Sequence, residues 1–307
     1  MDLSKITNFR DSNQITRAYF DSILVEARYL DSCMPDLSMT LFEKTFASPI
    51  MIAAFSHLSG THPGGMVEMA KGAKLAGILN WAGMGDEDEF TRIRETGAET
   101  IKIVKPYQDR EKVFRYLKHA EKEGALAVGM DIDHSFDHRG YNDVCLGMEM
   151  KPVTREELAS FVKATDLPFV VKGVLSVQDA VKCKEAGVSG ILLSHHHGIQ
   201  SFAMPPLAML PRIKNAIGNS MEIFVDCSVD TGADAFKCLA LGAKAVCVGR
   251  AILPSLHDEG AQGVKKYVDR MTDDLRALMA RTASGTLSQL SADVLYDAST
   301  LQPLAQR

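Results

Sequence analysis

The stretch that decides the fold is Pro168–Gln200, PFVVKGVLSVQDAVKCKEAGVSGILLSHHHGIQ. It holds two short apolar runs, 168–171 and 191–193, and each run ends in polar residues. Lys172 follows the first run, and a serine with three histidines, 194–197, follows the second. In parallel α/β folds the carboxyl ends of the strands are where ligands bind. The stretch therefore predicts two strands that each deliver polar groups to such a site.

A helix is expected between these two strands, because Ser176 and Asp179 fit a capping box and apolar residues follow at helical spacing. The same alternation runs along the chain. Predicted strands are 50–54, 77–81, 100–104, 125–131, 168–172, 190–194, 222–226 and 245–249. Predicted helices are 65–76, 87–96, 110–123, 154–165, 177–186, 207–217 and 231–241.

Eight such strand–helix steps predict one α/β domain over residues 1–307, a (β/α)₈ TIM barrel. Residues 1–47 form an N-terminal entry segment with a helix at about 15–26, and residues 261–307 form C-terminal helices. A doubly wound open sheet is the competing fold. The absence of a Gly-x-Gly-x-x-Gly motif after the first strand counts against it.

The composition is that of a soluble globular protein with a sizeable core, 46% hydrophobic and 24% charged in 307 residues. A formal net charge of −5 does not indicate binding to nucleic acid or to an anionic membrane. No apolar run reaches the ~18 residues of a spanning helix. The acidic start, Met1–Leu3, lacks the features of a signal peptide, so a cytoplasmic location is expected.

Six cysteines occur without a Cys-x-x-Cys pair, which favours reduced thiols over a disulfide framework or a zinc site. Cys227 follows a predicted strand and is the cysteine expected to line a pocket. The stretch His134–Lys151, after the fourth strand, lacks clear periodicity. At that rim of a barrel it is expected to be an active-site loop.

If the barrel closes, the polar groups after its strands meet at one mouth. Gly249–Arg250 and Asp226–Ser228 follow the last two strands, where many barrels bind phosphate, although an arginine capping a helix on the surface is an alternative. Lys172 could be a Schiff-base nucleophile, a cation for an anionic ligand or a lysine reaching solvent. One or two of the three histidines can face the mouth, and a histidine beside Asp131 would make a general base.

Three longer phrases resemble the FMN-dependent α-hydroxy-acid oxidase/dehydrogenase family, which includes the glycolate and lactate oxidases. They are PFVVKGVLSVQDA from Pro168, AGVSGILLSHHHGIQ from Ala186 and ALGAKAVCVGR from Ala240. The likeness also covers SPIMIAA from Ser48, His62–Pro63, Tyr107–Arg110 and the final helices, so it spans nearly the whole chain.

The resemblance implies FMN at the barrel mouth and a small-molecule substrate. His196 would be the base that removes a proton while a hydride equivalent passes to flavin N5, Asp131 would pair with its imidazolium, and Lys172 would stabilise the reduced flavin. Other cofactor contacts would come from residues at the remaining strand ends: Ala54, Phe55, Ser56, Asn80, Ser194, Asp226, Ser228, Gly249 and Arg250. Relatives are often tetramers, so a homotetramer is a further expectation. No metal is expected.

The chain departs from the family pattern at the substrate. Ile199 replaces the arginine that clamps the substrate carboxylate, and isoleucine offers none of that bidentate contact. Lys105 stands where the family has a tyrosine, and Asp230 stands where it has a phosphate-binding arginine. Lys105, His138 and Arg139 are the candidates for a replacement cation.

Three hypotheses follow. The first is an FMN-dependent oxidoreductase acting on a small hydroxylated substrate, with oxygen or another compound as electron acceptor. The second is a flavin-dependent isomerase resembling type 2 isopentenyl-diphosphate isomerase. The third is a barrel that binds flavin or another ligand without catalysis.

Overall fold

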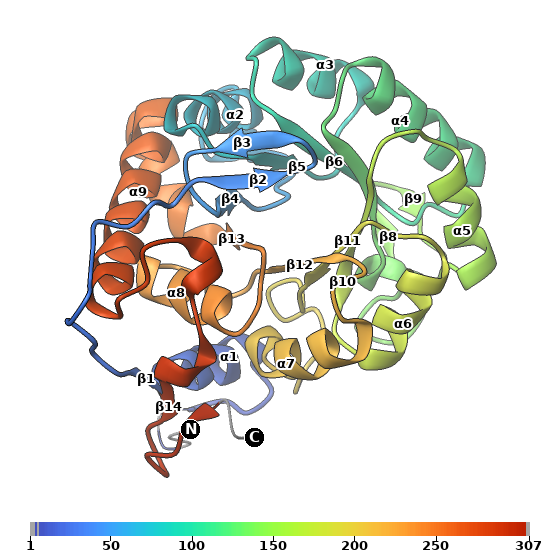
Figure 1. The fold of residues 1–307 in the computed structure, drawn as a ribbon. Coiled ribbons are helices and arrows are strands. Elements are labelled where there is room, and N and C mark those ends of the chain that lie inside the picture. Colours follow the sequence, from blue (N-terminus) through green and yellow to red (C-terminus); the bar gives the residue numbers. More distant parts are fainter. Residues whose placement is uncertain (1–3, 5, 305–307) are drawn as a thin grey trace.

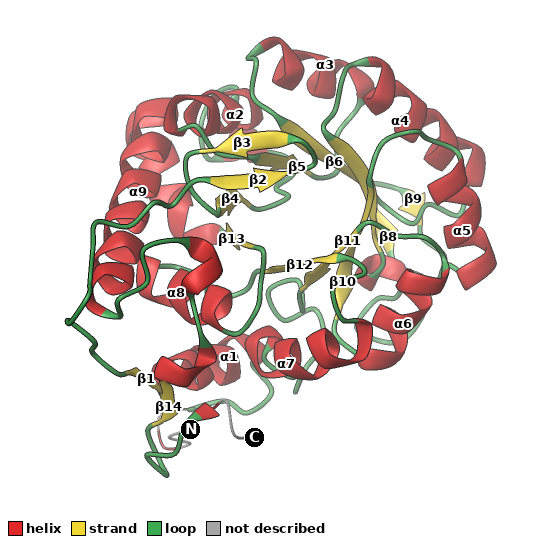
Figure 2. Ribbon diagram, in the orientation of Figure 1, coloured by secondary structure: helices red, strands yellow, loops and turns green. Residues whose placement is uncertain are grey.

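A barrel of eight parallel strands forms the centre of the molecule (Figures 1 and 2). The computed structural model describes residue 4 and residues 6–304. The barrel strands are β4 (Ile50–Ile52), β5 (Asn80–Ala82), β6 (Thr100–Val104), β7 (Ala127–Asp131), β10 (Phe169–Val174), β11 (Gly190–Leu193), β12 (Glu222–Val225) and β13 (Ala245–Val248). Each pairs with its neighbours, and a bridge between Met51 and Leu79 joins β4 to the β5 side, which closes the ring. The predicted TIM barrel is confirmed.

Helices surround the barrel, as Figure 1 shows. They are α1 (Ser12–Asp21), α2 (Gly65–Ala76), α3 (Glu87–Glu95), α4 (Arg110–Lys122), α5 (Arg155–Lys163), α6 (Val177–Glu185), α7 (Pro206–Ile217), α8 (Gly232–Ala240) and α9 (Leu253–Arg281). Several begin at capping residues: the Thr154 and Thr231 hydroxyls take part in full capping boxes with Glu157 and Asp234. Ser176 caps α6 by accepting a hydrogen bond from the backbone N–H of Asp179 at 3.0 Å.

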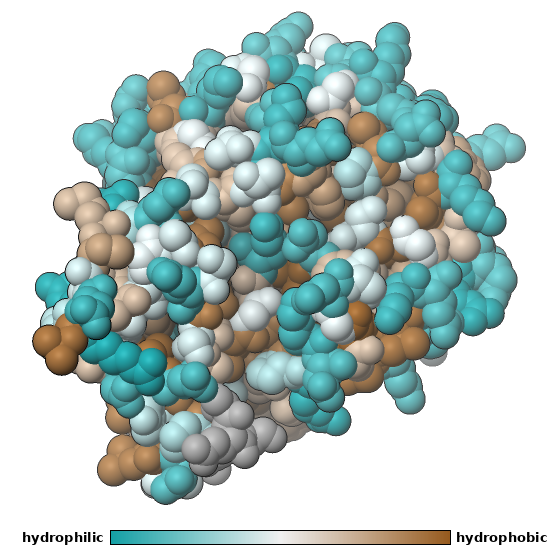
Figure 3. Space-filling model, in the orientation of Figure 1, coloured by the Kyte–Doolittle hydropathy of each residue, from teal (hydrophilic) through white to brown (hydrophobic). Residues whose placement is uncertain are grey.

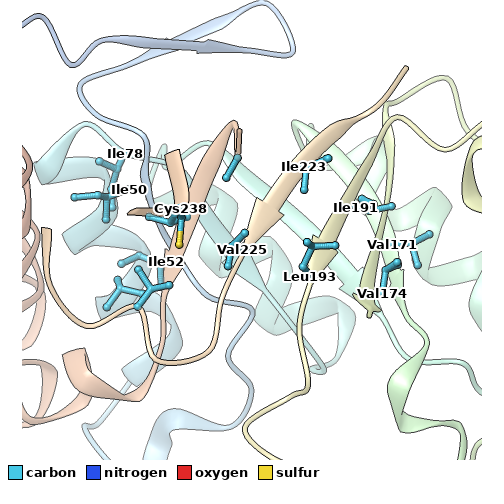
Figure 4. Close-up of a cluster of buried hydrophobic side chains, with 14 of the residues drawn as sticks. Ile50, Ile52, Ile78, Val171, Val174, Ile191, Leu193, Ile223, Val225 and Cys238 are labelled. Carbon is cyan, nitrogen blue, oxygen red and sulfur yellow. The ribbon is translucent and has the colours of Figure 1, made fainter. Parts of the chain in front are cut away.

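Alternate residues of each strand face the helices or the barrel interior. The helix-facing set forms the main core, and Figure 4 shows Ile191, Leu193, Ile223 and Val225 within it. The interior set is a second cluster that includes Met51, Trp81 and Phe224. The hairpin of β2 (Met39–Leu41) and β3 (Lys44–Phe46) packs its apolar side chains onto this interior cluster and overlies the β4–β5 side of the barrel in Figure 1.

The same alternation places a polar layer at the carboxyl ends of the strands. In three strands an apolar residue that faces the barrel interior is followed, two positions later, by a polar residue. These pairs are Val170 and Lys172, Leu192 and Ser194, and Phe224 and Asp226. Lys172 is also the register partner of Asp131 in β7. The fold therefore brings these side chains together above an apolar interior.

Some predicted boundaries were wrong. The entry helix ends at Asp21 instead of continuing to residue 26, because residues 23–25 form β1 (Ile23–Val25), which pairs with β14 (Leu295–Asp297). The segment after α9 is accordingly not helical throughout. It contains 3₁₀ turns, η5 (Leu287–Gln289) and η6 (Ala292–Val294), before β14.

The fifth barrel strand, β10, continues past Lys172 to Val174, with a register shift at Gly173. Gly173 has φ +92°, and a Cβ there would lie 2.7 Å from the Asp133 side chain. A glycine is therefore needed at this bulge, and the bulge brings Asp133 against the strand beside Lys172.

The molecular surface in Figure 3 is mostly hydrophilic, with scattered apolar patches. α9 is 29 residues long but carries charged residues throughout, and residues 253–260 and 261–281 meet at a non-helical Gly260. Within the described part of the chain, no helix combines the length and apolar character needed to cross a membrane.

Candidate functional site

Two lysines and an aspartate form a buried ionic layer at the barrel mouth. Lys105 Nζ donates a hydrogen bond to Asp131 Oδ2 at 2.7 Å, and Lys172 Nζ lies 3.6 Å from Asp131 Oδ1. Burial alone would raise the pKa of Asp131, but the charges of Lys172 and Lys105 outweigh it and hold that pKa well below its usual value. Burial likewise opposes charge on Lys172, yet Asp131 and Asp133 raise its pKa. Lys172 is therefore held in its charged form within this layer.

His196 joins this layer through a strained turn after β11. His196 and His197 both have positive φ, 49° and 56°, a conformation that L-residues other than glycine seldom adopt. The backbone N–H of His196 donates to Ser194 Oγ at 3.0 Å, which fixes the turn. The imidazole Nδ1 then lies 2.8 Å from Lys172 Nζ and 3.4 Å from Asp131 Oδ2. Backbone strain of this kind clusters at functional sites.

Asp133 is a site residue that the sequence reasoning missed. Its Oδ1 lies 2.8 Å from His196 Nδ1, closer than the predicted partner Asp131. Burial and the charge of Asp131 raise the pKa of Asp133 to about 6. Burial disfavours a charged His196, but Asp131 and the bonds to both carboxylates raise the His196 pKa overall. The pair thus favours a charged imidazole.

Two oxygens of these carboxylates, Asp131 Oδ1 and Asp133 Oδ2, are buried and accept no hydrogen bond from any described residue. Buried polar atoms are normally paired, so unsatisfied ones call for a ligand or water. Lys172 Nζ lies 3.6 Å from both atoms, so the charge of the lysine stabilises these two oxygens.

A second histidine, His134, contacts His196 from the other side. His134 lies in η3 (Asp133–Ser135), and its Nε2 is 3.1 Å from His196 Nε2. Its Nδ1 lies 2.9 Å from Asp143 Oδ2, just before the small hairpin of β8 (Val144–Cys145) and β9 (Met148–Glu149). The stretch predicted to be an active-site loop therefore contains a hairpin and supplies two groups to the site. The density of titratable residues in DIDHSFDH, 131–138, could have pointed to His134 but not to Asp143.

A cavity of about 580 Å³ opens beside this cluster. Lys172, His196 and the 53–55 segment line one side of the cavity. Asp226, Ser228, Gly249 and Arg250 are also among its lining residues. A Cβ added at Gly249 would meet no atom within 4 Å, so the backbone there is open to the cavity. This set suits a long anionic cofactor, with Lys172 for an electron-rich ring and Arg250 for a phosphate.

Cys227 lines the cavity, as expected, and all six cysteines are free. Cys227 and Ser228 have φ of 64° and 59°, two consecutive left-handed residues in the loop after β12. Turned backbone of this kind directs N–H groups toward anions. The loop therefore holds strained backbone at the cavity wall, where the sequence predicts a phosphate contact.

Other predicted cofactor residues lie behind the cavity wall. Asn80 is buried and its amide nitrogen donates to Thr100 Oγ1 at 3.4 Å, while Ser194 supports the His196 turn. Ser56 is half-buried, next to the lining residue Phe55, and lies against Gly83. His195 is bonded to Thr16 Oγ1 at 2.8 Å, so of the three histidines His196 and His197 line the cavity, as the sequence predicted.

The four predicted substrate residues are dispersed. Lys105 is held by Asp131, and the exposed Arg139 pairs with Asp137 at 2.8 Å. His138 and Ile199 line a second, larger cavity of about 1110 Å³, which Asp133 also borders. The structure therefore does not gather Lys105, His138 and Arg139 around one position where an arginine clamp would act.

Arg17 of α1 is another residue that sequence reasoning missed. It lines the first cavity beside Asp230 and donates two hydrogen bonds to Asp234, at 2.7 and 3.1 Å. Burial, with the charge of Asp234, raises the pKa of Asp230. The cavity end near Asp230 thus contains two arginines, Arg17 and Arg250.

Together these features define a (β/α)₈-barrel enzyme whose cofactor cavity and acid–base groups meet at the carboxyl ends of the strands. Comparison with known proteins identifies the class of enzyme. A family model described as FMN-dependent dehydrogenase matches residues 7–157 and 148–297. The chain belongs to this family. It is accordingly an FMN-dependent oxidoreductase that acts on CH–OH groups, as the sequence resemblance indicated.

Relatives and solved structures agree. The peroxisomal (S)-2-hydroxyacid oxidase GLO3 of Arabidopsis thaliana is 27% identical, over 89% of this chain and 84% of that protein. The 4-hydroxymandelate oxidase of Amycolatopsis orientalis is 26% identical, over 78% and 76%. A mandelate oxidase structure with (S)-2-phenylpropionate superposes with a TM-score of 0.83 at 26% identity, covering 93% of this chain and 90% of the other.

Proposed function

We propose that this protein oxidises the CH–OH group of a small hydroxylated compound, with His196 as the base. The observation that carries the proposal is the 2.8 Å separation between Lys172 Nζ and His196 Nδ1, both of which line the cavity that suits FMN. When FMN is bound, it supplies the acceptor for the hydride equivalent from the substrate carbon. The residues of the chain supply the proton chemistry and the charges.

In this proposal His196 takes the hydroxyl proton of the substrate and becomes an imidazolium. Asp133 and Asp131, 2.8 and 3.4 Å from Nδ1, stabilise the charge that forms there. Lys172 holds a positive charge at the same wall of the cavity and favours negative charge on the bound ring. Gly249 and Arg250, with the loop 226–228, would hold the phosphate of the cofactor.

We propose that the substrate is a 2-hydroxy acid or a related alcohol that is held without the usual arginine clamp. The hydroxy-acid names of the relatives support the class. Ile199 in the second cavity, and the pairing of Lys105 and Arg139 with aspartates, argue for a different way of holding the substrate. Oxygen is one candidate for the electron acceptor, and a quinone or another protein are others.

A stopped-flow screen tests the proposal. The FMN-loaded protein is mixed without oxygen with 2-hydroxy acids, neutral alcohols and amines, and the loss of flavin absorbance is followed. A hydroxylated compound should bleach the flavin, and His196→Ala should abolish fast bleaching while FMN stays bound. Rapid bleaching by that variant would overturn the role of His196.

We further propose a homotetramer. Exposed apolar side chains near the second cavity, Phe136, Phe202 and Met204, support self-association at this face. Light scattering would measure the mass. Cytoplasmic location stays a prediction that cell fractionation would test, and some of the relatives are named peroxisomal.

A further inference from the structure

Three metal-ligating side chains meet at the rim of the barrel mouth. His134 Nδ1 lies 2.9 Å from Asp143 Oδ2, and Cys145 Sγ lies 3.3 Å from that oxygen and 3.8 Å from that nitrogen. Imidazole nitrogen, carboxylate oxygen and thiolate sulfur are the ligands that zinc takes in proteins. In a tetrahedral site, bonds of about 2.0–2.3 Å place such atoms roughly 3.3–3.6 Å apart. The three observed separations differ from these values by roughly 0.4 Å or less.

The loop after β7 holds these side chains in place. The backbone N–H of Asp143 donates to the carbonyl oxygen of Ser135 at 3.2 Å, which ties the segment of Asp143 to that of His134. The N–H of Val144 donates to Asp143 Oδ1 at 2.8 Å, so the other carboxylate oxygen is the one that faces the two remaining ligands. Cys145 is fixed by the register of β8 with β9. A ligand set that is positioned in advance needs little rearrangement to take an ion.

Charge and access favour a divalent cation at this place. When an ion binds, the Cys145 thiol gives its proton to solvent, and the thiolate and the Asp143 carboxylate together balance two positive charges. His134 and Asp143 have side-chain exposures of 21% and 19%, and Cys145 is half-buried, so an ion can reach the ligand atoms from solvent. Magnesium and calcium prefer oxygen ligands, whereas a sulfur, nitrogen and oxygen set suits zinc.

We propose that His134, Asp143 and Cys145 form a regulatory site for a zinc-class divalent ion, the rim site, with water as the fourth ligand. The sequence does not predict this site, since the three residues match no common ligand spacing.

A second group of metal-ligating atoms lies close by and is the competing location. It consists of Asp131, Asp133, His134 and His196. Lys172 Nζ lies 3.6 Å from both carboxylates and 2.8 Å from His196 Nδ1. The ammonium group already supplies the positive charge at that location, which leaves the rim site as the place for an ion.

An ion at the rim site reaches the base through His134. This link rests on the proposed role of His196 as base. Coordination through Nδ1 leaves the ring hydrogen of His134 on Nε2, which lies 3.1 Å from His196 Nε2. The imidazolium of the proposed mechanism also carries hydrogen on its Nε2, so two N–H groups would face each other. Zinc therefore disfavours the imidazolium and slows flavin reduction.

Isothermal titration calorimetry of the FMN-loaded protein with zinc chloride tests the site without a substrate. One ion should bind tightly to each chain. Cys145→Ala should weaken this binding by more than about 100-fold, because loss of an outer partner of a ligand alone costs about 10–100-fold. Cys33→Ala removes an exposed thiol elsewhere and is the matched control, which should leave the affinity unchanged. Equally tight binding by Cys145→Ala, or no binding by the unaltered protein, would overturn the site.

Zinc-edge X-ray absorption of the zinc-loaded holoenzyme tests the ligands without any variant. The expected shell has one sulfur at about 2.3 Å, with nitrogen and oxygen atoms at about 2.0–2.2 Å. A shell without sulfur would exclude Cys145 as a ligand and overturn the site.

Anaerobic flavin bleaching measures the effect of the ion on the base. Zinc should slow bleaching by a hydroxylated compound about tenfold or more, the factor that corresponds to a lost hydrogen bond to a charged group. Cys145→Ala should lose this response to zinc. Equal rates with and without zinc would overturn the regulatory link. Fast bleaching in His196→Ala would instead overturn the proposed function, so the two failures differ.

Discussion

Asp133 Oδ1 lies 2.8 Å from His196 Nδ1, although the Asp133 side chain is only 11% exposed and lies next to a second carboxylate, Asp131. Burial and this neighbour raise its pKa from 3.8 to about 6. This arrangement places the Asp133 carboxyl group beside the His196 base, and it lowers the free energy of unfolding by a measurable amount. A group with a raised pKa in the folded state binds its proton more tightly there than in the unfolded chain.

The sign of the pH dependence follows from these pKa values. Below pH 3.8 both states hold the proton, and between 3.8 and about 6 the unfolded state loses it first, so stability falls as the pH rises. Asp133→Asn removes this loss. We expect it to raise the free energy of unfolding at about pH 8 by on the order of 2–3 kcal/mol more than at about pH 4.

Urea denaturation at the two pH values measures this difference. Asp137→Asn is the control. Its partner Arg139 lowers the Asp137 pKa, so this substitution should lower the free energy of unfolding more at about pH 8 than at about pH 4. An equal effect of Asp133→Asn at both pH values would contradict a raised pKa for Asp133.

Removal of the base gives the second prediction. His196→Ala should slow flavin reduction by about 10²–10⁴-fold, the usual contribution of a general base. FMN should stay bound, because the Gly249–Arg250 end of the cavity is unchanged. Single-turnover bleaching and flavin fluorescence measure the two quantities. His195→Ala should leave the bleaching rate nearly unchanged if the protein folds, since His195 bonds Thr16 instead of lining the cavity.

Much of this architecture could be predicted from sequence because it depends on local patterns. Strand alternation placed Lys172 and Asp226 at one barrel mouth, and the structure has them lining one cavity. Asp133 was missed because its position depends on the bulge at Gly173, a feature of the tertiary structure. Arg17 was missed for a similar reason, since α1 reaches Asp234 across more than two hundred residues of chain. Such long-range contacts leave no periodic signal in the sequence.

The acidic residue near the phosphate end gives the third prediction. Asp230 lines the cavity, where the family resemblance implies an arginine, and its burial raises its pKa. Asp230→Arg should tighten FMN binding by roughly tenfold. A charge-assisted hydrogen bond to the phosphate contributes about 1.5–3 kcal/mol, and repulsion between the new arginine and Arg17 offsets part of this contribution. Fluorescence titration of the cofactor-free protein measures the affinity, and Asp230→Asn separates loss of the negative charge from gain of the positive one. Weaker binding by the arginine variant would show that Asp230 does not face the phosphate.

Backbone strain at Ser228 gives the fourth prediction. Its φ of 59° is left-handed, which costs an L-residue roughly 1–2 kcal/mol and a glycine almost nothing. Ser228→Gly should therefore raise the free energy of unfolding by about 1 kcal/mol, less the added entropy of the unfolded glycine. Chemical denaturation of the cofactor-free protein measures this difference. Ser228→Ala keeps the strain, so a gain of equal size in that variant would assign the effect to the lost hydroxyl.

The substrate side gives the last prediction. Ile199 lines the second cavity, which Asp133 also borders, so an arginine placed there would have a carboxylate as a competing partner within the same cavity. Ile199→Arg alone should raise the rate of flavin reduction by a 2-hydroxy acid only slightly. Ile199→Arg with Asp133→Asn should raise it by more than the two single changes predict, because the new guanidinium is then free to bind a carboxylate. The comparison uses kcat/KM for lactate and for a neutral alcohol, with Ile199→Leu as the size control. An equal gain for both substrates would mean that the arginine does not recognise the carboxylate.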